Sequence, residues 1–189
     1  MLIKKGKLFV FSAPSGAGKT TIVRDVLKSF PELVFSISAT TRKKRENEIE
    51  GVHYFFISEE EFKKKIEADE FVEWERFYDY YYGTLKCFID ENISNGKSVV
   101  FEVDVKGGVS IKEKYNEAVT IYIMPPGIEA LKERLINRKT ENEEDFGKRI
   151  KRAEMELSYK DKFDHVIVNE DLETAKKEVK ELVNKLIKE

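Results

Sequence analysis

The stretch that decides the fold is "SAPSGAGKTT" (residues 12–21), which directly follows the apolar run "LFVF". It matches the pattern G-x-x-x-x-G-K-[ST], except that Ala13 stands at the first glycine position. Gly16 and Gly18 allow successive backbone N–H groups to turn toward an anion, which favours a phosphate-binding loop. An ordinary glycine-rich turn between strand and helix is the alternative, but such a turn needs no Lys-Thr pair at this offset.

The side chains of this loop indicate a nucleotide with its metal ion. Lys19 can reach the β- and γ-phosphates of ATP, and the Thr20 hydroxyl can bind Mg²⁺. The helix that follows presents its positive end to the same phosphates. A phosphate loop alone does not separate kinases, GTPases, motors and transporters. The expected ATP-binding residues of the loop are Ala13, Pro14, Ser15, Gly16, Ala17, Gly18, Lys19, Thr20 and Thr21.

Composition limits the classes of protein to consider. The 189 residues suit one domain, and no apolar run approaches the roughly 20 residues of a membrane span. The formal net charge of −2 argues against a general nucleic-acid binder. A single cysteine excludes an intramolecular disulfide and fits a reducing cytoplasm. The basic start "MLIKKGKLFVFS" lacks a small-residue cleavage site, so we expect no signal peptide.

Strands and helices alternate along the chain, which predicts a parallel sheet covered on both faces. The segment from about 34 to 85 is richer in strands and looks like an insertion. We expect strands at 7–12, 33–38, 53–57, 70–77, 97–105, 118–124 and 165–169. We expect helices at 20–30, 58–69, 85–96, 127–139, 142–160 and 171–189.

Two polar clusters fall within the expected insertion. "SATTRKKR" (38–45) places Arg42 and Arg45 three residues apart, and guanidinium groups bind phosphate oxygens in a bidentate manner. Taken alone, the run "RKKR" is more often surface charge on a solvated loop. "YDYYYGT" (78–84) supplies hydroxyls that can donate to phosphate, although buried or interface tyrosines are the simpler interpretation. Glu73 lies on an otherwise apolar strand and should therefore have a partner or face a cleft.

Acidic and basic residues elsewhere suggest a metal site and a lid. In "FEVDV" (101–105), Glu102 and Asp104 alternate along an expected strand and should point the same way, as in strands that support Mg²⁺. Two arginine pairs lie on successive helices either side of a polar segment, an arrangement that fits a lid closing over a phosphoryl group. The pairs are Arg134 with Arg138, and Arg149 with Arg152. Salt-bridged helix faces are the alternative, which we prefer for Arg134 and Arg152.

Taken together, these stretches resemble the guanylate kinase family, whose members transfer phosphate from ATP to GMP. The matching segments are "SAPSGAGKTT", "SATTRKKRENEIEGVHYFF", "EFVEWERF", "YYYGT", "FEVDVKGG", "MPPGIEALKERL" and "HVIVNEDL". The resemblance implies an α/β P-loop nucleoside monophosphate kinase fold with a five-stranded parallel core sheet flanked by helices. It also implies one domain over 1–189, with a core (1–35, 86–125 and 159–189), a small mixed α/β GMP-binding part (36–85) and a helical lid (126–158).

The resemblance also assigns roles to individual residues. The GMP phosphate is expected at Arg42, Arg45, Tyr54 and Tyr82, and the guanine base at Ser38, Glu73, Thr84 and Asp104. Lys19, Arg42, Arg138 and Arg149 are the expected catalytic residues, with Arg138 and Asn169 also contacting ATP. Mg²⁺ is expected on Thr20, with Glu102 bound through water. The implied substrates are ATP with GMP or dGMP, in purine nucleotide metabolism, for a cytoplasmic monomer or homodimer that contacts neither nucleic acid nor membrane.

The sequence departs from the family pattern at two further positions. Position 102 is Glu where the family usually has Asp, and Lys139 follows Arg138 where Gly is common. Cys87 and Trp74 are expected in or near the core.

Two alternatives to guanylate kinase activity follow from the same resemblance. A related kinase of ribose bisphosphate shares the phosphate loop but should lack the guanine-reading residues. Scaffold domains related to the family bind phosphorylated partners without catalysis and generally have a damaged loop.

Overall fold

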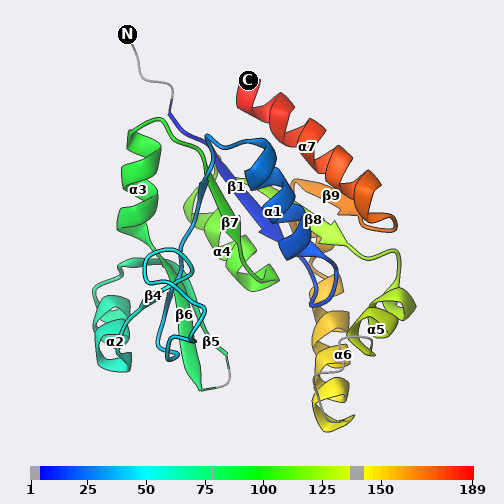
Figure 1. The fold of residues 1–189 in the computed structure, drawn as a ribbon, viewed down its shortest axis with the longest axis horizontal. Helices are drawn as coiled ribbons and strands as arrows, with labels where there is room; N and C mark the ends of the chain where they lie inside the picture. The colour runs from blue at the N-terminus through cyan, green and yellow to red at the C-terminus, as the bar shows by residue number, and fades with distance from the viewer. Residues whose placement is uncertain (1–4, 78, 137–142) are drawn as a thin grey trace.

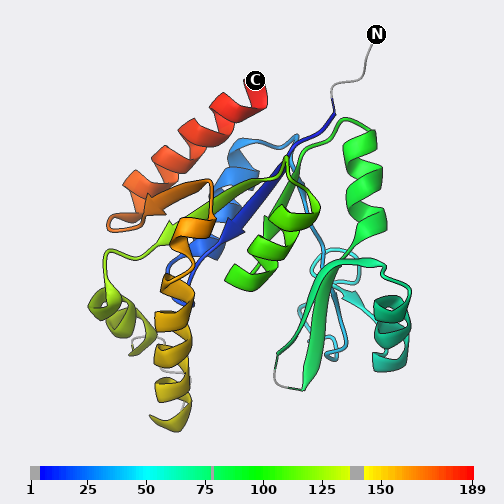
Figure 2. The same cartoon turned by 180° about the vertical axis from the view of Figure 1, so that it is seen from behind.

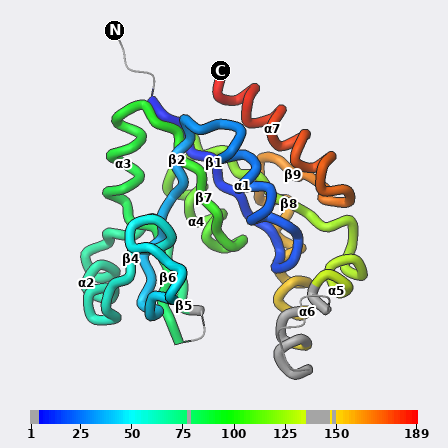
Figure 3. Tube along the Cα trace, in the orientation of Figure 1, coloured from blue at the N-terminus to red at the C-terminus, as the bar shows by residue number. Residues whose placement is uncertain are grey.

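The computed structural model describes residues 5–77, 79–136 and 143–189, and Figure 3 traces their path. Five parallel strands form the central sheet in the order β2-β7-β1-β8-β9 (Figure 1). These strands are β1 (Leu8–Ser12), β2 (Val34–Phe35), β7 (Val99–Glu102), β8 (Val119–Met124) and β9 (His165–Val168). The five-stranded parallel core sheet that we expected is therefore confirmed.

Side chains of β1 alternate between two buried faces of this sheet. Phe9 and Phe11 pack with α1 and α7 on one face. Leu8 and Val10 pack with α3 and α4 on the other, as the opposite views in Figures 1 and 2 show. The four helices are α1 (Lys19–Ser29), α3 (Lys86–Ser94), α4 (Val105–Lys114) and α7 (Leu172–Lys188). A continuous apolar run at β1 is what a strand buried on both faces requires.

A second, smaller sheet lies beside the core and has its own apolar cluster. Its strand order is β4-β3-β6-β5, with one parallel and two antiparallel pairs. Phe62 of α2 is fully buried and stacks on Phe71, with ring centroids 4.3 Å apart. The elements are β3 (Ala39–Thr40), β4 (Phe55–Phe56), α2 (Glu59–Glu67), β5 (Phe71–Phe77) and β6 (Tyr80–Leu85).

Two helices project from the other side of the core (Figure 1). They are α5 (Ile128–Ile136) and α6 (Glu143–Leu157), and a short 3₁₀ turn (Lys160–Lys162) leads from α6 to β9. Leu131 of α5 and Ala153 of α6 are fully buried against each other's helices. None of the described helices is both long and apolar enough to cross a membrane.

Several local expectations need correction. The strand expected at 97–105 ends at Glu102, because Asp104 caps α4 by accepting the Gly107 N–H. The argument that Glu102 and Asp104 share one face of a strand is therefore wrong. We did not expect α4, whose sequence "VKGGVSIKEK" contains two poor helix formers, or β6, whose tyrosines we treated as a cluster.

Two further predictions concern single side chains that we placed in or near the core. Cys87 is exposed, and 46% of Trp74 is exposed, so both predictions are wrong. The expected helix start at Ser58 is confirmed, because its hydroxyl accepts the Glu61 N–H at 3.1 Å.

The separate apolar cluster of the small sheet predicts that this sheet can unfold by itself. Replacing Phe62 with Ala removes a buried ring at a cost of about 3–5 kcal/mol. We expect amide hydrogen exchange to accelerate over residues 53–85, while the core strands keep their protection. Phe9→Ala is the matched variant in the main core and should accelerate exchange throughout. Equal acceleration of both regions by Phe62→Ala would show that the two clusters unfold together.

Candidate functional site

The phosphate loop adopts the backbone that its glycines allow. Gly16 and Gly18 have φ of 90° and 92°, in the left-handed region that favours glycine. Gly18 has a second constraint, since a Cβ there would lie 2.5 Å from the side-chain nitrogen of Asn169. Ala13 is buried and does not appear among the described residues with positive φ, so the absence of a glycine there causes no backbone strain.

Neighbouring elements hold this loop by hydrogen bonds. Asn169, at the end of β9, donates its side-chain N–H to the Ala17 carbonyl at 2.7 Å. Glu156 of α6 is only 3% exposed and accepts the Ser15 N–H at 3.1 Å. Arg134 of α5 donates to the backbone carbonyl of Asn169 at 2.9 Å. The loop is thus fixed from both β9 and α6.

Lys19 and Thr20 point toward the end of β7. The Lys19 ammonium donates to the Val103 carbonyl, and the Thr20 hydroxyl donates to the Glu102 carboxylate. Burial lowers the pKa of Lys19, while the surrounding carboxylates, of which Glu102 is the strongest, oppose this shift. A hydroxyl and a carboxylate side by side at a phosphate loop form a donor set that suits Mg²⁺.

Mg²⁺ usually takes one or two protein oxygens and completes its shell with water and phosphate. No group of three or more His, Cys, Asp or Glu that could hold a metal ion occurs in the described residues, and Mg²⁺ at such a loop does not need one. Thr20 and Glu102 therefore fit the ion that the sequence led us to expect.

Three of the residues predicted for the acceptor phosphate meet in the small sheet. Tyr54 and Tyr82 have ring centroids 6.1 Å apart, and the Arg42 guanidinium lies 5.4 Å from the Tyr54 ring centroid. Arg42 also forms two hydrogen bonds to Glu48, at 2.7 and 3.0 Å. These bonds raise the pKa of Arg42 and hold the pKa of Glu48 at about 2. A carboxylate thus holds Arg42 in a bidentate geometry that also suits a phosphate.

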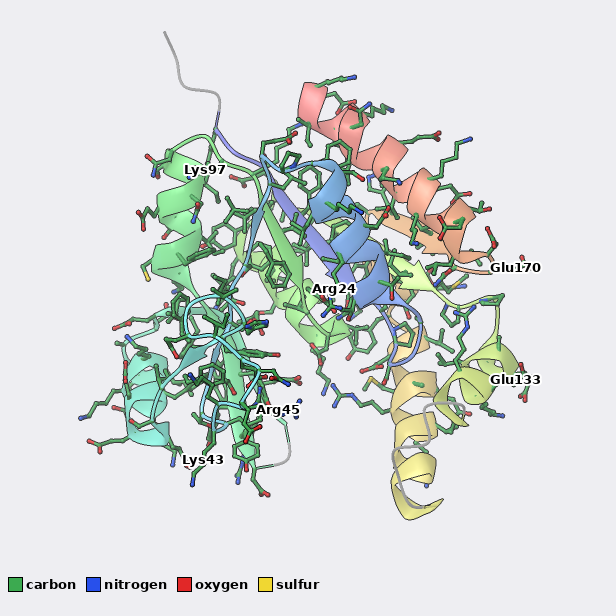
Figure 4. The ribbon with its side chains drawn as sticks, in the orientation of Figure 1. Arg24, Lys43, Arg45, Lys97, Glu133 and Glu170 are labelled. Carbon is green, nitrogen blue, oxygen red and sulfur yellow. The ribbon has the colours of Figure 1, made fainter. Side chains whose placement is uncertain are left out.

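Arg45 is the fourth predicted phosphate contact. Its backbone N–H donates to Glu48 at 2.8 Å, and its side chain is exposed. Figure 4 shows Arg45 on the small-sheet side and Arg24 on α1. The exposed side chain leaves the Arg45 guanidinium accessible to a ligand.

A pair of carboxylates converges at the start of α4. Glu73 accepts a hydrogen bond from the Thr84 hydroxyl at 2.8 Å, and Asp104 accepts the Gly107 N–H at 2.8 Å. A Cβ on Gly107 would lie 3.3 Å from an oxygen of each carboxylate, so both acids border the same small volume. Ser38 precedes Ala39, which pairs with Gly83, so the strand register directs Ser38 toward Thr84. The four residues predicted to read a base therefore lie in one region.

Burial makes two acids of β5, Glu73 and Glu75, unusually basic. It raises the pKa of Glu73 to about 7, with a smaller contribution from the charge of Asp104, whereas the Thr84 hydrogen bond acts in the opposite direction. Glu75, on the same strand, also has a pKa of about 7, because it is partly buried beside Asp104. Desolvated acids of this kind are common at functional sites.

Some predicted residues cannot be compared with the structure. Arg138 and Lys139 lie outside the described residues, and Arg149 belongs to α6 but its side chain is outside the described part. The predicted contact of Asn169 with adenine remains a prediction, although its buried Oδ1 has no hydrogen-bond partner among the described residues.

Sequence reasoning missed four residues of the site: Glu48, Glu75, Gly107 and Glu156. Glu48 lies within the segment that carried the resemblance, so its proximity to Arg42 could have suggested a pair. Nothing in the local sequence links Glu156 to a loop more than a hundred positions earlier.

Comparisons with known proteins agree with this geometry. The family model described as guanylate kinase matches residues 5–186. A guanylate kinase from Thermotoga maritima is 50% identical over 171 residues, covering 90% of this chain and 83% of that protein. One from Caldanaerobacter subterraneus is 46% identical over 180 residues, covering 95% and 87%. The crystal structure of guanylate kinase from Anaplasma phagocytophilum superposes with a TM-score of 0.77 at 28% identity, covering 98% and 88%.

The raised pKa of Glu73 predicts a pH-dependent effect of its replacement. Between pH 4.5 and about 7 the native protein holds a proton that the unfolded chain releases, so this group's contribution to stability falls as the pH rises. Glu73→Gln removes the ionisation penalty, and urea unfolding should show a gain of about 3 kcal/mol at pH 8 and little at pH 4.5. Glu67→Gln, at an exposed position, is the control and should change neither value. A gain of the same size at both pH values would contradict the burial argument.

Proposed function

The chain belongs to the guanylate kinase family, and from this premise we propose that it transfers the γ-phosphoryl group of ATP to GMP, giving ADP and GDP. The observation that carries the proposal is the convergence of Glu73, Asp104 and Thr84 beside an Arg–Tyr cluster and an intact phosphate loop. We extend the proposal to dGMP, since none of the named contacts involves the sugar.

The loop supplies the ATP site. Backbone N–H groups that Gly16 and Gly18 turn inward, together with the first turn of α1, face the β- and γ-phosphates. Lys19 neutralises charge that spreads over the transferred group. Mg²⁺, bound by Thr20 with Glu102 beside it, would further neutralise the phosphate oxygens. We place adenine near Asn169, because its Oδ1 finds no partner in the part of the chain that the structure describes and can accept a hydrogen bond from a ligand donor.

The Arg–Tyr cluster supplies the GMP phosphate site. Arg42, Arg45, Tyr54 and Tyr82 present two guanidinium groups and two phenol hydroxyls, which together can satisfy the oxygens of a monophosphate. The phosphate of GMP is already ionised at neutral pH, so no general base is required. Catalysis therefore depends on positioning and charge neutralisation, with Arg138 and Arg149 proposed to join from the lid.

The carboxylate pair supplies base specificity. Guanine has adjacent donors at N1 and the 2-amino group, which a carboxylate such as Glu73 can accept together. The Ser38 hydroxyl can donate to O6, and the Thr84 hydroxyl could do so only by giving up its bond to Glu73. Adenine lacks this donor pair and would leave a desolvated carboxylate without partners, which costs several kcal/mol.

The apolar clusters support a division of the chain into three parts. We propose a core (1–35, 86–125 and 159–189), a GMP-binding part (36–85) and a lid (126–158), because each part has its own buried side chains. The unpaired, exposed thiol of Cys87 fits a reducing compartment such as the cytoplasm.

The activity is tested by ADP release with ATP and Mg²⁺ and a panel of acceptors in parallel: GMP, AMP, CMP, dTMP and ribose bisphosphate. We expect turnover with GMP, reduced at least 1000-fold by Lys19→Ala because the loop loses its phosphate-neutralising cation. Turnover with another acceptor and none with GMP would overturn the base assignment. A folded protein that is silent with every acceptor would favour a binding domain without catalysis.

Base recognition is tested separately by Glu73→Gln. The amide offers one acceptor where the carboxylate offers two, so we expect the KM for GMP to rise about 10- to 100-fold with the KM for ATP nearly unchanged. Glu67→Gln is again the control. An unchanged KM for GMP would remove Glu73 from the base site.

A further inference from the structure

Arg152 lies on α6, but its side chain reaches acids from three separate parts of the chain. Its Nε donates to Glu156 at 2.8 Å on the same helix. One terminal nitrogen donates to Asp104, the cap of α4, at 3.2 Å and lies 3.8 Å from a carboxylate oxygen of Glu75 on β5. These contacts connect the helix that projects from the core with the carboxylate pair beside the small sheet.

The contact with Glu156 extends this connection to the phosphate loop. One oxygen of Glu156 accepts from Arg152, and the other accepts the Ser15 N–H at 3.1 Å. Glu156 is 3% exposed, so neither bond is readily exchanged for water. A continuous chain of charged hydrogen bonds therefore runs from the phosphate loop through α6 to Asp104.

Asp104 is held from two sides by this arrangement. Its Oδ1 accepts the Gly107 N–H at 2.8 Å, and its Oδ2 accepts from Arg152. Each oxygen of a carboxylate has two lone pairs, so Oδ1 keeps one acceptor site beside its bond to the Gly107 N–H. Oδ1 also borders the volume beside Gly107 that an oxygen of Glu73 borders. Both restraints leave Asp104 able to accept a donor from a molecule in that volume.

Charge gives the Arg152 contact its importance. Glu75 and Asp104 are neighbouring acids, and Asp104 is a major reason for the raised pKa of Glu75, after burial. Arg152 is the cation that opposes this effect at Glu75. A side-chain hydrogen bond between Glu75 and Asp104 also raises the pKa of Glu75. Without Arg152, Glu75 would keep its proton and draw Asp104 toward itself through this bond, away from its present direction. Among the described residues, other charged groups that act on Glu75, Asp104 or Arg152 include Glu73 of β5, Lys19 of α1 and Glu156 of α6.

We propose that Arg152 is a positioning residue for guanine specificity, which holds Asp104 toward the 2-amino group of the base by bridging it to Glu75. The inference rests on the proposed function, because it assumes that guanine occupies the volume between Glu73 and Asp104. Guanine has three N–H bonds on this edge, one at N1 and two on the 2-amino group. Glu73 can accept two of them, so the third requires a second carboxylate.

This assignment predicts discrimination between two closely related purine nucleotides. IMP keeps the N1–H of GMP and lacks the 2-amino group, so it has no donor for Asp104. If Asp104 no longer points toward the base, the binding of GMP should therefore weaken and the binding of IMP should stay nearly the same. A general loss of structure would instead weaken the binding of GMP, IMP and ATP together.

The test compares wild type with Arg152→Met, which keeps side-chain length and removes the charge. We expect the KM for GMP to rise about tenfold, while the KM for ATP and the Ki of IMP as a competitive inhibitor stay within about twofold. Arg152→Lys should recover part of the loss, since an ammonium keeps the charge but not the fork. Adding Glu75→Leu to Arg152→Met should also recover part of the loss, because no side chain at position 75 is then left to draw Asp104 aside. Lys151→Met, at an exposed position one residue earlier, is the matched control.

Several outcomes would overturn the proposal. An unchanged preference for GMP over IMP in Arg152→Met, or an equal loss for GMP, IMP and ATP, would reduce Arg152 to a structural role. If Arg152→Met does not fold, Arg152→Lys is the deciding variant. We expect its preference for GMP over IMP to fall two- to fourfold. An unchanged preference would contradict the proposal. Wild-type turnover with GMP in the same assay separates the role of Arg152 from the proposed function. If the wild type shows no turnover with GMP, the proposed function itself is overturned.

Discussion

The hydrogen bonds that fix the phosphate loop from outside are the interaction on which the rest of the site depends. The loop has few side chains of its own with which to stay ordered, and glycine gives it a large conformational entropy to lose. Glu156 holds it at Ser15, Asn169 at Ala17, and the Val103 carbonyl at Lys19. These three partners come from α6, the end of β9 and the end of β7. The geometry of the loop therefore depends on the positions of these three elements.

The second requirement is that acids remain buried where a base is to be read. Glu73 and Glu75 carry a penalty for ionisation, visible in pKa values near 7, that a purely structural surface would avoid. The chain limits this penalty with the Thr84 hydroxyl and with Arg152. Burying these carboxylates lowers the stability of the fold, but it leaves hydrogen-bond acceptors that water does not already satisfy. Such acceptors allow a site to distinguish two bases.

Most of the architecture, but only part of the site, could be predicted from the sequence. The phosphate loop and the alternation of strands and helices were enough to predict the parallel core, since both depend on short-range patterns. The end of β7 was misplaced because Val103 and Asp104 continue the alternation of a strand, whereas Asp104 is the N-cap of a helix and accepts the Gly107 N–H. The family resemblance located Arg42, Tyr54, Tyr82 and Glu73 together. It gave no indication of Glu75 or Glu156, whose roles arise from contacts between distant elements.

The strand order of the core has a consequence for how the chain folds. β1 is the central strand, yet its partners are β7 and β8, with Leu8 beside Val99 and Ser12 beside Tyr122. A chain emerging from the ribosome must therefore keep its first strand and the phosphate loop unpaired until those distant segments appear. The small sheet lies between β1 and β7 in the sequence, and its strands are separated by fewer residues. The entropic cost of closing its loops is therefore lower. Nucleation there, before the central strand finds its neighbours, would shorten the stretch of unfolded chain that β1 has to search.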